Sequence, residues 1–411
     1  MALMSLMRFY HNGWIKEQFL DNAFHFKYFG FHWVSVAEPT VLYGLFFLLM
    51  ASALCVAFGL FYRITSVLFF VLFTYFELLD ATYYLNHYYF ISCCAFLLIF
   101  LPAHHAFSLD QKLFGWKPKK EAAAWTIYAL RMQFTLLYFF AGIAKIQPDW
   151  LLEAMPLSIW LKARTDLPLI GPLLDYEATA YLMSWGGMLF DVLAGFLLLI
   201  PKTRTFTWIM AAVFHALTAI IFPQIGVFPY VMMVGTLIYF PWTNLTHRIT
   251  STSSNKQDAN PRLQSILPYV ISLYFILQVI IPLRHHLYHG NLFWHEQGFR
   301  FSWRVMLMEK AGYCEFEIVD TEDNRRTMVR PSDHLNPQQE KMMATQPDLI
   351  LQYAHHLSSE YSKNWQTEVE VYANCWCSLN GRGSTPYINS DINLAKEKDS
   401  FSPKTWILPF E

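Results

Sequence analysis

The sequence is poor in charged residues, which make up 15% of its 411 residues, whereas 55% are hydrophobic and 18% aromatic. A soluble globular chain carries about 25% charged residues, so this composition excludes an ordinary soluble protein. The formal net charge is -1 and there is no long basic block, which argues against a nucleic-acid partner. The composition therefore indicates a multi-pass membrane protein whose main partner is the lipid bilayer.

Cysteine and histidine also lack the spacing of a metal site. The six cysteines form no zinc or redox motif, although a strand over Cys375-Trp376-Cys377 would point both thiols to one face. Within the apolar segments no two histidines stand four residues apart, and the adjacent His104 and His105 would diverge on a helix. We therefore expect no metal.

Hydropathy and charge divide the chain into a membrane part and a soluble part. Of the 61 charged side chains, 26 lie between Glu309 and Glu411. That last stretch alternates over Glu315–Val319 and Glu368–Cys377 and has helical spacing over Pro337–Tyr361, which predicts a small α+β soluble domain over 309–411. The fold class is thus a polytopic α-helical membrane protein of about eight spans, followed by this domain. The eight segments are at about 41–61, 64–79, 87–103, 124–144, 179–200, 206–222, 226–241 and 264–284.

Domain boundaries and orientation follow from these segments. We expect residues 1–40 to be the end of a helix followed by an interfacial segment, and residues 41–308 to be the transmembrane domain that contains the candidate site. Lysines and arginines concentrate in Lys112–Lys120, Lys202–Arg204 and Arg248–Arg262, alternate loops that would share the cytoplasmic side. The domain 309–411 is then expected to be extracytoplasmic.

One lysine stands where an apolar helix does not favour it. The run Trp125–Ala144 is almost entirely apolar, Lys145 follows it, and Pro148 ends the helix. Lys145 could snorkel, with its stem along lipid and its ammonium among the headgroups. It could equally face a polar cavity, where burial would let it act as a base near neutral pH. The local sequence leaves both interpretations open.

Other polar groups accompany it. Asp191 and His215 each lie inside an apolar run, and His104 and His105 follow a proline at a helix end. A helix-to-helix hydrogen bond is one explanation for Asp191 and His215, and interfacial exposure is one for His104 and His105. Their number instead favours an internal site for proton chemistry on an apolar molecule.

These residues occur in motifs that resemble the vitamin K-dependent gamma-glutamyl carboxylases and their bacterial relatives with an HTTM-type membrane domain. The matching motifs, in order, are Leu79-Asp80 with Asn86-His87; Ala103-His104-His105; Ala141-Gly142 to Lys145 with Asp149-Trp150; Asp191 with Ala194-Gly195; Phe214-His215 with Phe228–Met232; Phe301-Ser302-Trp303; and Ser378-Leu379-Asn380 with Arg382. They extend over most of the chain.

The resemblance implies a reaction and roles. Lys145 matches the lysine that acts as the base on reduced vitamin K. In that family the deprotonated vitamin reacts with oxygen and gives an oxygenated quinone species, which is itself a strong base. That species removes a γ-proton from a glutamate, and the resulting carbanion captures carbon dioxide. His105 matches the histidine that supports the lysine and the quinone, and His104 stands where the animal enzymes have asparagine. Asp191 and His215 would be further members of the site. The bacterial relatives imply an inner-membrane location and a glutamate-containing peptide or protein substrate.

The chain also departs from the animal members of that family. Their motif Tyr-Gly-Tyr-Ser-Trp reads Phe299-Arg300-Phe301-Ser302-Trp303 here, so the tyrosine hydroxyls at positions 299 and 301 are absent. By the same resemblance, Phe299 and Trp303 are predicted to bind the quinone. The resemblance links the first tyrosine to carboxylation, so a quinol oxygenase that makes the epoxide without carboxylation is an alternative. The long C-terminal region that helps animal enzymes bind propeptides is not seen beyond Glu411. A transporter or scaffold in which Lys145 only snorkels is a further alternative.

Overall fold

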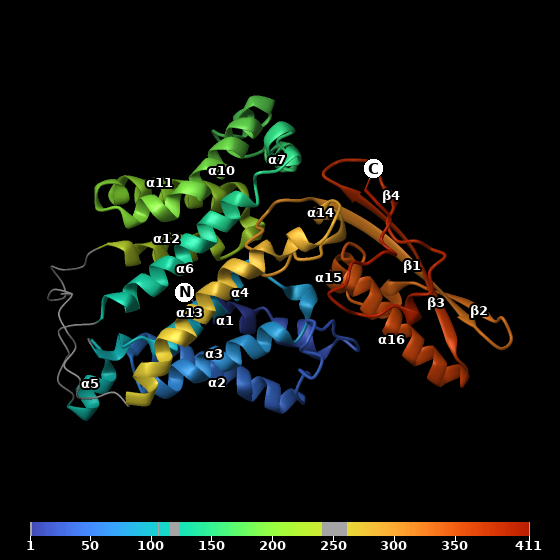
Figure 1. Cartoon of the computed structure of the whole chain (residues 1–411), viewed down its shortest axis with the longest axis horizontal. Coiled ribbons are helices and arrows are strands. Elements are labelled where there is room, and N and C mark those ends of the chain that lie inside the picture. Colours follow the sequence, from blue (N-terminus) through green and yellow to red (C-terminus); the bar gives the residue numbers. More distant parts are fainter. Residues whose placement is uncertain (1, 106, 116–122, 241–260, 411) are drawn as a thin grey trace.

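The computed structural model describes residues 2–105, 107–115, 123–240 and 261–410, with side chains from 265 onward in the last range. Helices occupy about the first three quarters of the chain, and a sheet with two helices occupies the rest, at the right of Figure 1. The helical part contains α1 (Ala2–His11), α2 (Pro39–Phe58), α3 (Tyr62–Leu78), α4 (Asn86–Phe100), α5 (Leu109–Phe114), α6 (Ala124–Ile143), α7 (Pro148–Leu152), α8 (Leu157–Lys162), α9 (Gly171–Leu174), α10 (Glu177–Leu199), α11 (Pro201–Ile221), α12 (Phe228–Gly235), α13 (Pro261–Leu283) and α14 (Leu292–His295).

Five helices in the described part of the chain are long and apolar enough to cross a membrane: α2, α6, α10, α11 and the segment Ser265–Leu287 that includes most of α13. The predicted number of about eight spans is not confirmed. Two of the other predicted segments form the shorter apolar helices Asn86–Phe100 and Phe228–Tyr239, the second of which tightens into a 3-10 turn from Thr236. The remaining one forms α3, which has 17 residues. Of the three basic loops used for orientation, two lie largely outside the described residues.

The soluble part contains a four-stranded antiparallel sheet in the order β2-β1-β3-β4. Its strands are β1 (Lys310–Asp320), β2 (Arg326–Val329), β3 (Val369–Leu379) and β4 (Thr385–Pro386), and its helices are α15 (Pro337–Met343) and α16 (Pro347–Trp365). The predicted helix over Pro337–Tyr361 is therefore two helices, because Pro347 begins the second. Every second residue of β3 is buried, including Cys375 and Cys377, as the alternating pattern predicts.

A disulfide joins the two central strands. Cys314 in β1 is directly opposite Cys375 in β3 and is bonded to it. Cys377 is a buried free thiol. The sequence did not predict this bond, because two cysteines at a sequence separation of 61 leave the pairing undetermined.

The soluble part is anchored on the helical part through buried polar contacts. The Asp80 carboxylate, after α3, accepts hydrogen bonds from the Thr82 hydroxyl and from Nε2 of Gln339 in α15. One apolar cluster also includes Trp150 and Phe222 of the helical part together with Phe316 and Ile318 of β1. The two parts therefore share a core, and a domain boundary near residue 308 stays a prediction.

Candidate active site

A pocket inside the helical part brings three of the predicted site residues together. Lys145, Asp191 and His215 all line it, from the end of α6, the middle of α10 and the middle of α11. The pocket encloses about 790 Å³ of space, part of it open to the outside. Its other walls are mainly apolar and aromatic, including Tyr138, Trp150, Trp160, Phe214, Phe222 and Phe228. Such a site suits a largely apolar ligand with a few fixed polar contacts.

Lys145 is buried just beyond the C-terminal end of α6. Its side chain donates from Nζ to Oδ2 of Asp191 at 2.7 Å and to the Ala141 carbonyl at 3.1 Å. The ammonium also lies 5.6 Å from the centre of the Trp150 ring. Lys145 and Asp191 are each only 6% exposed, so the lysine does not snorkel toward headgroups. A buried ion pair of this kind is expected at a functional position within a helical bundle.

Small residues on α6 and α10 allow this ion pair to form. A Cβ on Gly142 would lie 2.4 Å from the backbone nitrogen of Val192, next to Asp191. One on Gly195 would lie 2.7 Å from Cα of Thr135 in α6. The two helices thus touch backbone to backbone, a contact that only glycine permits here. This approach brings the Asp191 carboxylate within reach of Lys145.

The turn after Lys145 is fixed by the soluble part. The Asp149 carboxylate in α7 accepts two hydrogen bonds of 2.8 Å from the Arg382 guanidinium and one of 2.6 Å from the Asn380 side-chain amide. Burial opposes the charged form, but these hydrogen bonds prevail and bring the pKa of Asp149 below its ordinary value. The neighbouring Trp150 donates from its indole nitrogen to the Ser184 carbonyl in α10 at 2.9 Å. Residues after β3 therefore help to position the segment that follows the lysine.

Tyr138 is a site residue that the sequence reasoning missed. Its hydroxyl lies 2.7 Å from Nε2 of His215, which joins α6 to α11 on the wall of the pocket. Tyr138 precedes Lys145 by two helical turns and so faces the same side of α6. That spacing was the signal that could have identified it.

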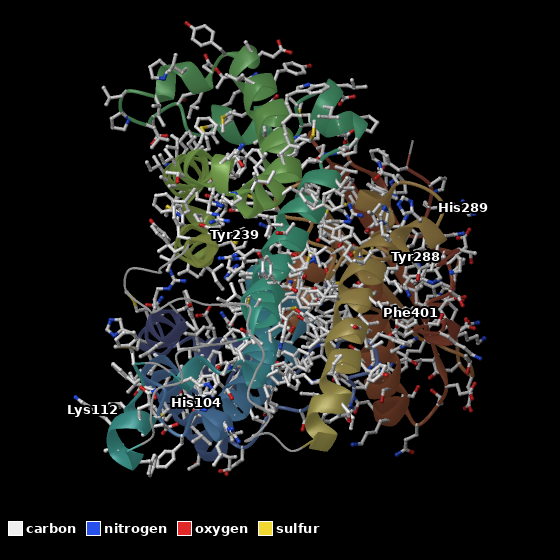
Figure 2. The ribbon with its side chains drawn as sticks, turned by 60° about the vertical axis from the view of Figure 1, so that its left-hand side comes forward. His104, Lys112, Tyr239, Tyr288, His289 and Phe401 are labelled. Atoms are coloured by element: carbon white, nitrogen blue, oxygen red, sulfur yellow. A yellow bond between two sulfur atoms is a disulfide. The ribbon has the colours of Figure 1, made fainter. Side chains whose placement is uncertain are left out.

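His104 and His105 do not line the pocket around Lys145. They form a short 3-10 turn, Ala103–His105, after α4 and before α5. His104 is buried and stacks on Tyr62 with ring centres 5.1 Å apart. Figure 2 shows it in the same region as Lys112 of α5, at the lower left. The structure thus separates the predicted supporting histidine from the lysine, because α4 carries the chain away from the pocket before the turn begins.

Phe299 and Trp303 also lie outside this pocket. Trp303 is fully buried and stacks on Tyr89 with ring centres 4.8 Å apart. Phe299 lines a separate cavity with Arg284 and Glu296. Only Val305 and Met306, just beyond the predicted motif, reach the pocket around Lys145. The motif therefore supports the wall of the pocket without contributing to its lining.

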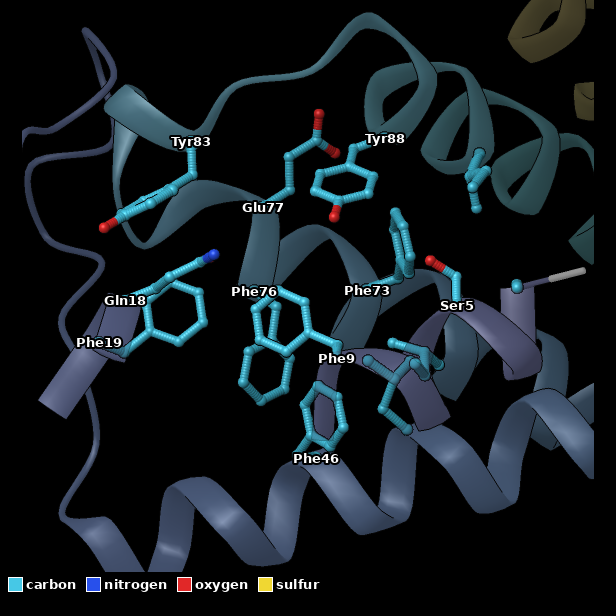
Figure 3. A pocket seen from close by; sticks show the side chains of 14 residues that line it. Ser5, Phe9, Gln18, Phe19, Phe46, Phe73, Phe76, Glu77, Tyr83 and Tyr88 are labelled. Atoms are coloured by element: carbon cyan, nitrogen blue, oxygen red, sulfur yellow. The ribbon is translucent and has the colours of Figure 1, made fainter. Parts of the chain in front are cut away.

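A second apolar pocket lies near α1 and the ends of α3 and α4. Figure 3 shows the Glu77 carboxylate beside Tyr88, with Phe9, Phe19 and Phe76 around the space. One oxygen of Glu77 accepts from the Ser92 hydroxyl at 2.6 Å. This pocket has no lysine, so it offers no amine base. Among the described residues no group of three or more His, Cys, Asp and Glu side chains could hold a metal ion.

Comparison with known families matches two models that together include almost the whole chain. Residues 1–243 match the HTTM domain, and residues 263–411 match the lumenal domain of vitamin K-dependent gamma-carboxylase. No solved structure matches the chain. The first match lies in the helical part, and the second includes α13, α14 and the α+β part. The chain belongs to the vitamin K-dependent gamma-carboxylase family.

Proposed function

We propose that this membrane protein oxygenates reduced vitamin K to its epoxide in the pocket around Lys145 and couples that reaction to carboxylation of a glutamate side chain. The family supports a carboxylase-like enzyme that uses reduced vitamin K. When bound, the quinol supplies the electrons that reduce oxygen. One oxygen atom then enters the epoxide and the other leaves as water, while carbon dioxide replaces a γ-proton of glutamate.

The observation that carries the proposal is the position of Lys145 Nζ. An ammonium has three donors, and here one points to Asp191 and one to the Ala141 carbonyl. The third is left for a ligand in the pocket that Lys145 lines. In its neutral form the amine keeps these two contacts with its two N–H groups, and its lone pair occupies the third position, while Nζ stays 2.7 Å from Oδ2 of Asp191. Lys145 is thus suited to take a proton from a quinol hydroxyl, with Asp191 holding its amine in place.

The rest of the pocket fits a naphthoquinol. Its walls are mostly aromatic and aliphatic, which suits fused rings and an isoprenoid chain. His215, which is hydrogen-bonded to Tyr138, offers a second polar contact in addition to the ion pair of Lys145 and Asp191. The apolar surround also limits access of water to a reactive species. Asp191 and His215 keep the roles predicted for them, whereas we no longer assign the support of the lysine to His105.

An extracytoplasmic position of the soluble domain is part of the proposal. Its support is the disulfide between Cys314 and Cys375, since such bonds persist in oxidising compartments and are rare in the cytosol. In a bacterium this would place the multi-pass protein in the inner membrane with the domain facing outward.

The test is one incubation of detergent-purified protein with reduced vitamin K, oxygen, a glutamate-containing peptide and labelled bicarbonate. We expect both epoxide and fixed label from the wild type, and neither from Lys145→Ala. Retained epoxide formation in that variant would overturn Lys145 as the base. Neither product from folded wild-type protein would instead favour the transporter or scaffold alternative.

The alternative of epoxide formation without carboxylation has one observation in its favour, the phenylalanines at 299 and 301. Phe301 is surrounded by Tyr28, Tyr84 and Tyr89, with ring centres 5.0 to 5.6 Å away. Epoxide without fixed label from the wild type would support it. In that case Phe299→Tyr tests whether the missing hydroxyl is responsible, because label fixed by the variant would then appear.

A further inference from the structure

A larger and more polar cavity adjoins the pocket around Lys145. It encloses about 1330 Å³ of space, part of it open to the outside. Five residues line both cavities: Trp160, Ile225, Phe228, Val305 and Met306. We call this larger cavity the vestibule. The polar side chains that line it include Arg8, Gln18, Asn86, His87, Tyr88, Gln224 and Glu309. The five shared residues place the vestibule directly beside the pocket around Lys145.

Arg8 is the cation of the vestibule. Its guanidinium lies over the Trp14 ring, 5.4 Å from the ring centre. On another side lies the loop before α12, where a Cβ at Gly226 would be 3.8 Å from Nη2 of Arg8. The guanidinium thus lies between the Trp14 ring and this loop. No carboxylate among the described residues forms an ion pair with it.

The acidic residue of the vestibule is already engaged. Oε2 of Glu309 accepts a hydrogen bond of 2.6 Å from the Trp160 indole, and the Glu309 backbone N–H donates to the Asn380 side chain at 2.9 Å. Asn86 also has a fixed position, because its amide donates to the Arg304 carbonyl at 2.8 Å. His87 is buried beside Phe228, which lies on the shared wall. Arg8 is therefore the cationic group of the vestibule, with no ion pair to a described carboxylate, and can bind an anion.

We propose that the vestibule binds the glutamyl side chain of the peptide substrate and that Arg8 anchors its carboxylate. A guanidinium presents paired N–H donors that match a carboxylate in two-point geometry. The γ-carbon is bonded directly to the carboxylate carbon, so this anchor holds the reacting C–H close to the shared wall. The inference rests on the proposed function, and it assigns the substrate-binding side of that site.

Binding of peptides tests the inference without requiring turnover. The probe is a blocked, fluorescently labelled five-residue peptide with one central glutamate, compared with the same peptide carrying glutamine, both measured by anisotropy in neutral detergent. The variants are Arg8→Gln, Arg8→Lys, which keeps the charge but loses the planar fork, and Arg63→Gln. Arg63 is the matched control, because it is an exposed arginine of α3 that lines none of the pockets described above.

We expect wild type to bind the glutamate peptide more tightly than the glutamine peptide. Arg8→Gln should raise the glutamate-peptide Kd roughly tenfold to a hundredfold, the usual range for a lost hydrogen bond to a charged group, and leave the glutamine-peptide Kd unchanged. Arg8→Lys should keep part of the preference for the glutamate peptide, and Arg63→Gln should keep all of it. A glutamate preference retained in Arg8→Gln, or absent from wild type, would overturn the proposal.

Turnover then separates this inference from the proposed function. Arg8→Gln should still form epoxide at saturating quinol, with a raised KM for the peptide in label fixation. If the wild type forms no epoxide but the glutamate preference disappears in Arg8→Gln, the proposed reaction is contradicted and the role of Arg8 in peptide binding is supported. If the wild type forms epoxide but Arg8→Gln keeps the glutamate preference, the role of Arg8 is contradicted and the proposed reaction is supported.

Discussion

Nζ of Lys145 and Oδ2 of Asp191 lie 2.7 Å apart although 46 residues separate them in the chain. Both side chains are buried, and the pair lies on the wall of an aromatic pocket. Two glycines let α6 and α10 approach closely enough for this contact. The pair thus depends on helix packing as much as on the two side chains themselves.

The first prediction concerns the stability of this pair. Lys145→Met should lower the free energy of unfolding by about 3 to 5 kcal/mol, because it leaves the Asp191 carboxylate buried without its partner. The double variant Lys145→Met with Asp191→Leu should recover most of that loss, since both charges are removed. Thermal unfolding in detergent measures both effects. Epoxide formation should stay absent in both variants, and activity in the stable double variant would contradict the role of Lys145.

The second prediction concerns the contact between α6 and α10. Gly142→Ala should cost about 1 to 3 kcal/mol, because its Cβ would meet the backbone of Val192. It should also lower epoxide formation, since the shift needed to relieve the overlap moves Asp191 away from Lys145. Gly186→Ala in α10 is the matched control, with nothing within 4 Å of its Cβ. That change should be neutral or stabilise by about 0.5 to 1 kcal/mol. Equal behaviour of the two variants would exclude this explanation.

The third prediction concerns pH and the Asp149 contact with Arg382. The pKa of Asp149 is lower in the folded protein than its ordinary value. The folded state therefore favours the ionised carboxyl, and the resulting stabilisation is fully present above the unfolded pKa of about 3.9. It is lost as the pH falls through the lower folded pKa. Asp149→Asn should consequently melt at a lower temperature than wild type at pH 7, and the difference should shrink below about pH 4. A difference that is constant with pH would show that the charge of Asp149 is not its cause.

The fourth prediction concerns the disulfide in the soluble part. Replacing Cys314 and Cys375 together by serine should destabilise that part by about 2 to 4 kcal/mol. Limited proteolysis should then cut β1 or β3 sooner than in wild type. Cys377→Ser is the control, because this buried cysteine lies on the same face of β3 and is not bonded. Under reducing conditions the wild type should become as sensitive as the double variant.

The sequence by itself determined the class of the protein. Scarce charge and long apolar runs require a lipid environment, and the alternation over Glu368–Cys377 and the concentration of charge after Glu309 predict the α+β part. It also identified Asp191 and His215, because a polar side chain inside an apolar helix must find a partner within the bundle, and Lys145, because a cation at the end of an apolar helix needs water or a partner. The family motifs were readable for the same reason.

The tertiary structure decided which of these residues meet. Lys145 and Asp191 form an ion pair because glycines bring α6 against α10, whereas His104 and His105 lie outside the pocket at a turn after α4. Tyr138 and Arg8 gained their significance only from the cavities that they line. Helical periodicity gives the face on which a side chain lies. The neighbour of that face depends on how the helices pack, and local sequence does not encode this packing.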